Sequence, residues 1–434
     1  MVISSSPFSQ LHRDLAHANL ERLSRHELPE KPKQDSENCD IAFNLLKKWS
    51  VQNKASIDAS IASQVFGGKA AISWPRAFLP FMESMAMYLR DYSKLRKAWK
   101  TYCDFKSKGP LEEADLETCI GQYHAAYNPI RELAQSWGMD FVVLCDLIHT
   151  NPQGHIAWDG PYCGAFFSTA AQKDKPFVGV AFKGTNPMNL REDDVDYNYQ
   201  LTDSGKYLGG TRVSAGVFAA LFNTFDRIED TAYDFITAAL GACVMEMSKA
   251  PDSVVCSHVT GHSLGGSYSS FFYTQLLQDG GIPSAQMATG DEYTFGAPRV
   301  GGQSWAVHNN SVVSASEGQS WRVVNDHDLV PQVPPTSLRP TELDFYHIDK
   351  GMKIFNSQLP EPIESEIGGP PPKVVGFNSL VALIRDVYDE TYHRKFPCEC
   401  LSREDNGRGK ANRVGYEVPL SYYKAMRYAI ENAK

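Results

Sequence analysis

A single serine with a glycine two residues away on either side is the clearest sign of chemistry in this sequence. The motif is Gly261, His262, Ser263, Leu264 and Gly265. The stretch before it suits a buried strand, and the stretch after it has helical spacing of apolar residues until Gly280 and Gly281. A serine at such a turn is strained, with its hydroxyl exposed, and the glycines relieve the crowding. The pattern predicts a nucleophile, and an ordinary strand-to-helix turn is the alternative.

A serine nucleophile needs a base to take its proton and a carboxylate to orient that base. After a turn of this kind, the acid and then the histidine follow the serine along the chain. Asp326 and Asp328 come just after an apolar stretch, and His347 and His393 come later. The backbone amide of Leu264, at the start of the expected helix, would donate to the oxyanion. The residues of a complete Ser-His-Asp centre are therefore present, with two candidates for the acid and two for the base.

The elements that must position these residues alternate between strand and helix after residue 140. Short apolar runs such as 177–185 read as buried strands, and helical patterns such as 214–247 separate them. This alternation predicts an α/β fold with a mostly parallel central sheet flanked by helices. Residues 1–140 read as an N-terminal arm and helical extension packed on the core, with a flexible linker or a surface arm at 24–40. The expected domains are thus 1–140 and 141–434.

The short stretches "FKGT", "GHSLGG", "YTFGAPRVG" and "NDHDLVPQVP" occur in this order along the chain. Together they resemble the successive blocks of the fungal class 3 lipases, over roughly residues 140–400. That family consists of α/β-hydrolases and includes triacylglycerol lipases and feruloyl esterases. The order of the blocks is more specific than any one of them. The resemblance therefore implies the α/β-hydrolase fold and hydrolysis of carboxylic esters.

The resemblance also selects among the candidate residues. It implies Ser263 as nucleophile, Asp328 as acid and His393 as base, with His347 as the alternative base. It adds Thr185, after Gly184, as the second oxyanion-hole residue beside Leu264. The remaining candidates are given structural roles: Asp326 as a loop cap, His258 as a strand residue, and His262 and His327 as local hydrogen-bonding residues.

The segment after Thr185 stands where the resemblance places a mobile lid, at residues 186–210. It is acidic, with Glu192, Asp193, Asp194 and Asp196, which disfavours anionic lipid surfaces and is compatible with neutral acylglycerols or soluble esters. An ordinary solvated loop is the alternative. The expected function is that of a triacylglycerol lipase or lipase-like esterase acting on a small-molecule or lipid ester. A feruloyl or other carboxylesterase and a lipase-like interaction scaffold are the alternatives.

Charge and cysteine content argue against some kinds of partner and binding site. The 434 residues carry a formal net charge of −9 and no basic cluster, which argues against a nucleic-acid partner. Nine scattered cysteines favour reduced thiols, and the pair at Cys398 and Cys400 lacks the further ligands of a zinc site. We expect no metal and no cofactor. No signal peptide or transmembrane segment is evident, which favours a cytoplasmic location, or secretion if the chain is a processed or engineered form.

Overall fold

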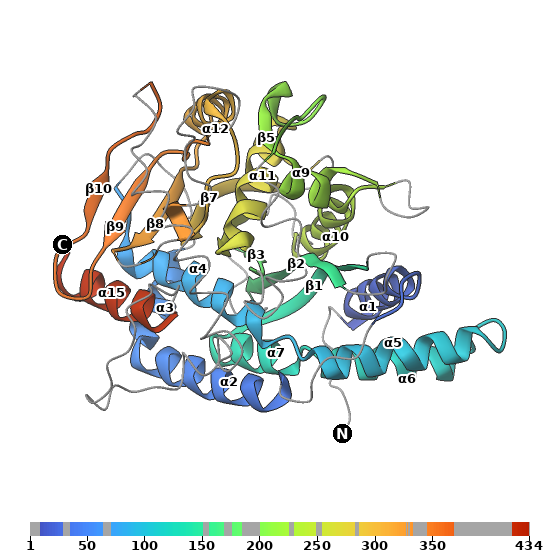
Figure 1. Ribbon diagram of the computed structural model, residues 1–434. Helices are drawn as coiled ribbons and strands as arrows, with labels where there is room; N and C mark the ends of the chain where they lie inside the picture. Colours follow the sequence, from blue (N-terminus) through green and yellow to red (C-terminus); the bar gives the residue numbers. More distant parts are fainter. Residues whose placement is uncertain are drawn as a thin grey trace, which may run out of the picture.

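The protein is built around one large mixed β-sheet, shown in Figure 1. The computed structural model describes residues 9–28, 35–63, 71–150, 156–168, 176–184, 200–224, 230–248, 254–282, 286–326, 328, 330–332, 345–368 and 419–433. The sheet has eight strands in the order β1-β2-β3-β6-β7-β8-β9-β10. The strands are β1 (Met139–Thr150), β2 (Ile156–Ser168), β3 (Phe177–Phe182), β6 (Val255–His262), β7 (Met287–Phe295), β8 (Ser320–Asn325), β9 (Gly351–Ile354) and β10 (Glu361–Ile363).

The centre of the sheet is parallel and its edges are antiparallel. Strands β3, β6, β7, β8 and β9 pair in parallel, each with the next. The pairs β1–β2, β2–β3 and β9–β10 are antiparallel. Parallel strands require crossover connections and therefore helices on the faces of the sheet. The predicted α/β class with a mostly parallel sheet is confirmed.

Helices cover both faces of the sheet (Figure 1). The N-terminal helices are α1 (Ser9–Leu23), α2 (Asp35–Gln52), α3 (Lys54–Ser63), α4 (Trp74–Ala86), α5 (Tyr92–Lys106), α6 (Glu113–Ala125) and α7 (Asn128–Ser136). The others are α9 (Ala215–Phe222), α10 (Ala232–Met247), α11 (Leu264–Gln278), α12 (Gln303–Ala315) and α15 (Pro419–Asn432). Helices α4, α7 and α15 pack against one face, and α9, α10 and α11 pack against the other.

Strand β3 shows why its apolar run forms a central strand. All six of its residues are buried. Phe177 and Ala181 join the apolar cluster on the side of α4, whereas Val178, Val180 and Phe182 join the cluster on the side of α11. Because successive side chains of a strand point to opposite faces, only a strand that is covered on both faces has reason to be apolar throughout.

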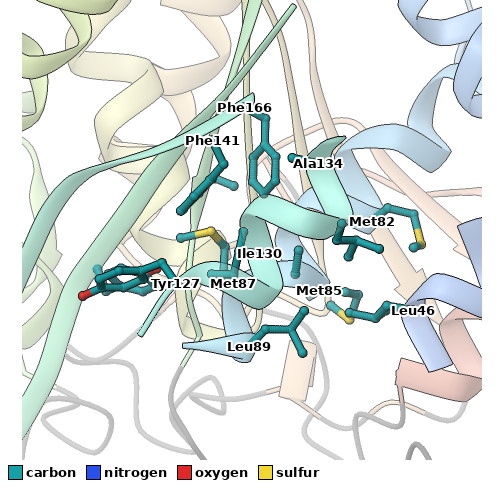
Figure 2. Close-up of a cluster of buried hydrophobic side chains, with 14 of the residues drawn as sticks. Leu46, Met82, Met85, Met87, Leu89, Tyr127, Ile130, Ala134, Phe141 and Phe166 are labelled. Atoms are coloured by element: carbon teal, nitrogen blue, oxygen red, sulfur yellow. The ribbon is translucent and has the colours of Figure 1, made fainter. Parts of the chain in front are cut away.

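The N-terminal helices share a buried cluster with the sheet. Figure 2 shows Met85, Met87 and Leu89 lying with Phe141 of β1 and Phe166 of β2. These side chains are at most 3% exposed. Met85, Met87 and Leu89 thus serve to pack the N-terminal helices on the sheet. The division into residues 1–140 and 141–434 stays a prediction, and within the described residues the two parts bury side chains against each other.

The structure refines the expectations for two stretches of the chain. The helical pattern at 214–247 is two helices, α9 and α10, and the second begins with a capping box in which Thr231 and Asp234 bond each other's backbone amides. The segment 24–40, expected to be a flexible linker or a surface arm, ends inside α2, which begins at Asp35. Helical propensity and spacing do not reveal where a chain must turn to keep both helices on the sheet.

The described part of the chain bears on two further expectations. Six cysteines within it are free thiols: Cys103, Cys119, Cys145, Cys163, Cys243 and Cys256. Cys398 and Cys400 lie outside the described residues. None of the described helices is both long enough and apolar enough to cross a bilayer.

A buried carboxyl group lies beneath helix α11 and predicts a pH-dependent stability. Glu292 of β7 accepts hydrogen bonds from Ser269 of α11 at 2.9 Å and from Ser320 of β8 at 2.6 Å. Burial raises the pKa of Glu292 to about 7, although these hydroxyls lower it. The folded state therefore holds a proton that the unfolded chain loses near its ordinary pKa of 4.5, and stability falls as the pH rises from about 4.5 through 7.

The substitution Glu292→Gln should remove the contribution of Glu292 to this decrease in stability with rising pH. The loss in the wild type amounts to at most about 3 kcal/mol between these limits. Urea unfolding at pH 5 and pH 8 measures it, and the difference between the two pH values should shrink in the variant. Glu317→Gln, at an exposed site, serves as the control. Equal pH dependence in wild type and Glu292→Gln would contradict the prediction.

Candidate active site

Ser263 occupies the turn between strand β6 and helix α11, where the motif predicts it. Its backbone has φ 56° and ψ −130°, a left-handed conformation that is rare for residues other than glycine. The turn is held by hydrogen bonds from the amide of Ser263 to the carbonyl of Phe295 and from the amide of Gly266 to the carbonyl of Ser263, both 2.9 Å. The serine therefore stands at the carboxyl end of a central parallel strand and at the positive end of a helix dipole.

The two outer glycines of the motif are required because other parts of the backbone lie too close to leave room for a side chain. A Cβ on Gly261 would collide with the carbonyl of Gly265. A Cβ on Gly265 would collide with the carbonyl of Phe182, the last residue of β3. Glycine at these positions thus lets the first turn of α11 lie directly against the end of β3. That contact brings the nucleophile beside the loop expected to complete the oxyanion hole.

The two expected oxyanion donors have different outcomes. Leu264 is the first residue of α11, so its amide has no partner within the helix and is free to serve a ligand beside Ser263. Thr185 lies outside the described residues. Its neighbour Gly184 is described, and a Cβ there would stand 3.1 Å from the Cβ of Ser263. The strand end that leads to Thr185 therefore reaches the nucleophile.

Asp328 lies in the loop after β8 and is buried, with an exposed fraction of 3%. Its Oδ2 accepts a hydrogen bond from the hydroxyl of Tyr422 at 2.5 Å, and its Oδ1 accepts from the amide of Val330 at 3.0 Å. Burial raises the pKa of Asp328 to about 7, although both donors lower it. A cationic imidazole next to this carboxylate would lower the pKa further, which is the electrostatic relation between acid and base in a triad.

Tyr422→Phe should move the acid limb of the kcat/KM profile upward by about 1 pH unit. The hydroxyl of Tyr422 stabilises the ionised form of Asp328, so its removal raises the pKa of the acid. Activity that needs the carboxylate is then lost at a higher pH as the solution is acidified. Tyr423→Phe is the matched control, because the hydroxyl of Tyr423 contacts Asn53 and Gln52 instead. Coinciding profiles for Tyr422→Phe and wild type would contradict the role of Tyr422.

The two histidine candidates also have different outcomes. His393 lies outside the described residues. His347 is buried, and its Nε2 donates to the carbonyl of Pro331 at 2.5 Å. Burial lowers the pKa of His347 well below its usual value, and the charges of Arg322 and Arg299 lower it further. A ring whose Nε2 proton is held by a backbone carbonyl is suited to fixing a loop, so these contacts favour His393 as the base.

A polar network fixes the loop that carries Asp328. Arg299 donates to the carbonyl of Gln332 at 2.8 Å and pairs with the carboxylate of Glu366, also at 2.8 Å. The amide of His347 donates to the same carboxylate at 2.7 Å, and its ring holds Pro331. The short helix η5 (Val330–Gln332) is thereby tied to the segment that follows β10. Bidentate arginine–carboxylate pairs are geometrically specific, so this network is well suited to keep the acid loop in one position.

The other residues given structural roles behave as follows. Asp326 forms an ion pair with Lys353 at 2.5 Å. His258 lies in β6 as expected and meets Glu83 of α4 at 2.5 Å. His262 was expected to bond locally, but its hydrogen bond of 2.9 Å is to Tyr88, 174 residues away in the sequence. His327 lies outside the described residues.

The segment expected to form a lid is described only in its second part. Residues 186–199, including the acidic cluster, lie outside the described residues. Within 200–214, β4 (Leu201–Asp203) pairs with β5 (Arg212–Ser214) in a separate two-stranded sheet. Leu208, in the short helix η4 (Leu208–Gly210), donates its amide to the side chain of Gln275 on α11 at 2.7 Å. This second part is therefore anchored to the helix that begins at the nucleophile.

Sequence reasoning missed several residues around the site. Tyr422, Arg299 and Glu366 contact the acid or its loop, and Tyr88 contacts the residue before the nucleophile. Arg299 belongs to the stretch "YTFGAPRVG", but the residues around it do not indicate which side chain it pairs with. The two tyrosines lie in segments whose spacing predicts helix and packing only, so no local signal distinguishes them.

Comparison with known proteins finds similarity to lipases. Residues 179–338 match the family model described as lipase (class 3). A triacylglycerol lipase of Arabidopsis thaliana is 28% identical over 193 residues, which is 39% of this chain and 36% of that protein. A triacylglycerol lipase of Ricinus communis is 26% identical over 263 residues, which is 53% of this chain and 48% of that protein. The chain thus spans less than half the length of these two relatives.

Shorter sequence similarities and the structural similarities include fungal proteins. A secreted mono- and diacylglycerol lipase of Fusarium solani is 34% identical over 104 residues, which is 24% of this chain and 28% of that protein. Lipase II of Rhizopus niveus aligns in structure with a TM-score of 0.38 and 18% identity, covering 69% of this chain and 88% of that one. The fold assignment rests on the strand order and the strand-serine-helix turn, which are those of an α/β-hydrolase. Residues 179–338, which include Ser263 and Asp328, are thus the part of this chain that is similar to the class 3 lipases.

Proposed function

We propose that this protein is a serine hydrolase that cleaves carboxylic esters, with acylglycerols as its main substrate class. The observation that carries the proposal is the backbone of Ser263, held at φ 56° at the first turn of α11. Such a conformation costs on the order of 1–3 kcal/mol and persists only where the surroundings enforce it. Here Gly261 and Gly265 permit it, and the buried carboxylate of Asp328 supplies the acid.

The proposed reaction proceeds in two stages. His393 takes the proton of Ser263 as the hydroxyl attacks the ester carbonyl, and Asp328 stabilises the imidazolium that forms. The amide of Leu264, aided by Thr185, donates to the oxyanion, and the dipole of α11 adds to this stabilisation. His393 then protonates the leaving alcohol. Water, activated by the same histidine, hydrolyses the acyl-enzyme and restores Ser263.

The acylglycerol preference is supported by the names of the relatives, which are triacylglycerol lipases and a mono- and diacylglycerol lipase. A feruloyl or other carboxylesterase would use the same centre with a differently shaped acyl pocket. An interaction scaffold is disfavoured by the strained serine, because a protein that only binds a partner gains nothing from that strain. We further propose that the protein makes transient contact with a lipid surface and that it is cytoplasmic.

Two measurements test this function. Purified protein should be labelled by a fluorophosphonate probe, and peptide mapping should place the label on Ser263. Hydrolysis of p-nitrophenyl esters from acetate to oleate, together with trioleoylglycerol and methyl ferulate, then ranks the substrate classes. Absence of both labelling and turnover would favour the scaffold. Turnover of methyl ferulate but not of any acylglycerol would replace the lipase proposal with the feruloyl esterase.

A further inference from the structure

One side chain of the N-terminal helical region reaches the residue before Ser263. Tyr88 lies in the short helix η1 (Met87–Leu89), directly after α4 and outside the matched residues 179–338. Its hydroxyl makes a hydrogen bond of 2.9 Å with Nδ1 of His262, the residue before Ser263. The two rings meet edge to face, with centroids 5.7 Å apart.

The same hydroxyl also borders the strand end that leads to the oxyanion loop. A Cβ on Gly184 would collide with the hydroxyl oxygen of Tyr88, and it would stand 2.6 Å from the carbonyl oxygen of His262 and 3.1 Å from the Cβ of Ser263. The tyrosine hydroxyl, the nucleophile turn and Gly184 therefore converge on one point. Gly184 has no side chain there, and the hydroxyl of Tyr88 occupies that space.

The residues before and after Tyr88 in the sequence are anchored in the fold. Met87 and Leu89 are fully buried in the cluster shown in Figure 2, beside Ile130 and Phe141. The next residue, Arg90, forms a buried ion pair of 2.6 Å with Asp146 of strand β1. A side chain carried on a backbone that is anchored in this way loses little further entropy when it orients a neighbour.

His262 is a suitable intermediary because its charge does not change in the working range of pH. It is buried, and burial lowers its pKa to about 3. A neutral imidazole offers one acceptor and one donor nitrogen, so its bond to the tyrosine hydroxyl persists at neutral pH. The backbone of His262 leads directly into the strained φ of Ser263, so the orientation of one residue constrains the other.

We propose that the helical region before the sheet completes the active site through Tyr88, which acts as a positioning residue for Ser263 by holding His262. The family segment alone does not supply this contact. The inference rests on the proposed function, since the rate that it concerns is the reactivity of Ser263. It assigns a catalytic contribution to residues 1–140, whose helices otherwise serve packing.

The test is the rate of fluorophosphonate labelling of Tyr88→Phe in the full chain. Loss of one hydrogen bond should slow labelling and lower kcat for p-nitrophenyl butyrate about tenfold, with KM within about twofold and the melting temperature nearly unchanged. The matched control is Tyr102→Phe, which removes a tyrosine hydrogen bond of 2.7 Å to Glu21 within the N-terminal helices. That variant should label at the wild-type rate.

The outcomes separate this inference from the proposed function. If the wild type is not labelled, the proposed function itself fails. If wild type and Tyr88→Phe are labelled equally fast, the function stands and the positioning role is overturned. A loss of rate that Tyr102→Phe shares would also overturn it, because the effect would then be general loosening.

A second variant keeps the test decisive if Tyr88→Phe does not fold. His262→Gln removes the same contact from the other side and should also slow labelling. In the double variant with Tyr88→Phe, the loss should not exceed that of His262→Gln alone, because both substitutions break one interaction. Labelling of His262→Gln at the wild-type rate, or fully additive losses, would overturn the inference.

Discussion

Replacing Ser263 with alanine should lower kcat for ester hydrolysis by a factor on the order of 10⁵–10⁶. The variant retains the proposed oxyanion donor at Leu264 and the proposed acid at Asp328, but no acyl-enzyme can form. The backbone strain at φ 56° remains, so the free energy of unfolding should stay within about 0.5 kcal/mol of the wild type. Steady-state hydrolysis of p-nitrophenyl butyrate and urea unfolding measure the two quantities.

A second variant, Ser263→Gly, tests the backbone strain separately. It should be equally inactive, yet more stable than the alanine variant by about 1 kcal/mol, because glycine adopts the left-handed conformation without strain. Ser267→Ala, a buried serine on α11, provides the control for loss of a hydroxyl elsewhere and should retain activity. Substantial turnover by Ser263→Ala would exclude this serine as the nucleophile.

Replacing Asp328 with asparagine should lower kcat about 10⁴-fold, the second largest effect that we expect. The carboxamide is nearly isosteric and can still accept a hydrogen bond from Tyr422. It carries no negative charge, so it cannot stabilise the imidazolium or hold the base in the required tautomer. Kinetics on the same ester measure the loss, and fluorophosphonate labelling of Ser263 should slow in parallel.

Asp326→Asn is the matched control, two residues away in the same loop. Its carboxylate pairs with Lys353 and is about one third exposed, so its removal should change kcat less than about twofold. If Asp326→Asn were the inactive variant and Asp328→Asn the active one, the assignment of the acid would have to be exchanged. Equal activity of both would remove Asp328 from the centre.

The features that the sequence predicted correctly are those set by neighbouring residues in the chain. The turn at Ser263 could be identified from the sequence because strand, glycines and helix lie within one short stretch, and the steric demands of the turn act between near neighbours. The central strands were readable for a similar reason, since a run that is buried on both faces must be apolar throughout. The position just after β8 left Asp326 and Asp328 as candidates for the acid, and the family resemblance selected Asp328.

Contacts between distant segments could not be read in this way. Tyr88 and His262 are separated by 174 residues, and Tyr422 and Asp328 by 94. Neither tyrosine differs in its local pattern from the aromatic residues that only pack, such as Phe78 or Phe81. Similarly, nothing in the sequence around Arg299 indicates that its partner is Glu366, which follows β10.

Spacing and backbone sterics over a few residues were enough to predict the α/β architecture and the strained serine turn. The side chains that surround this turn could be identified only from the folded chain. The tertiary structure brought the N-terminal helix η1 to His262, placed the C-terminal helix α15 on Asp328, and made His347 a support of the acid loop. The physical reason is that such contacts depend on how helices and loops pack on the sheet, and packing depends on the whole chain.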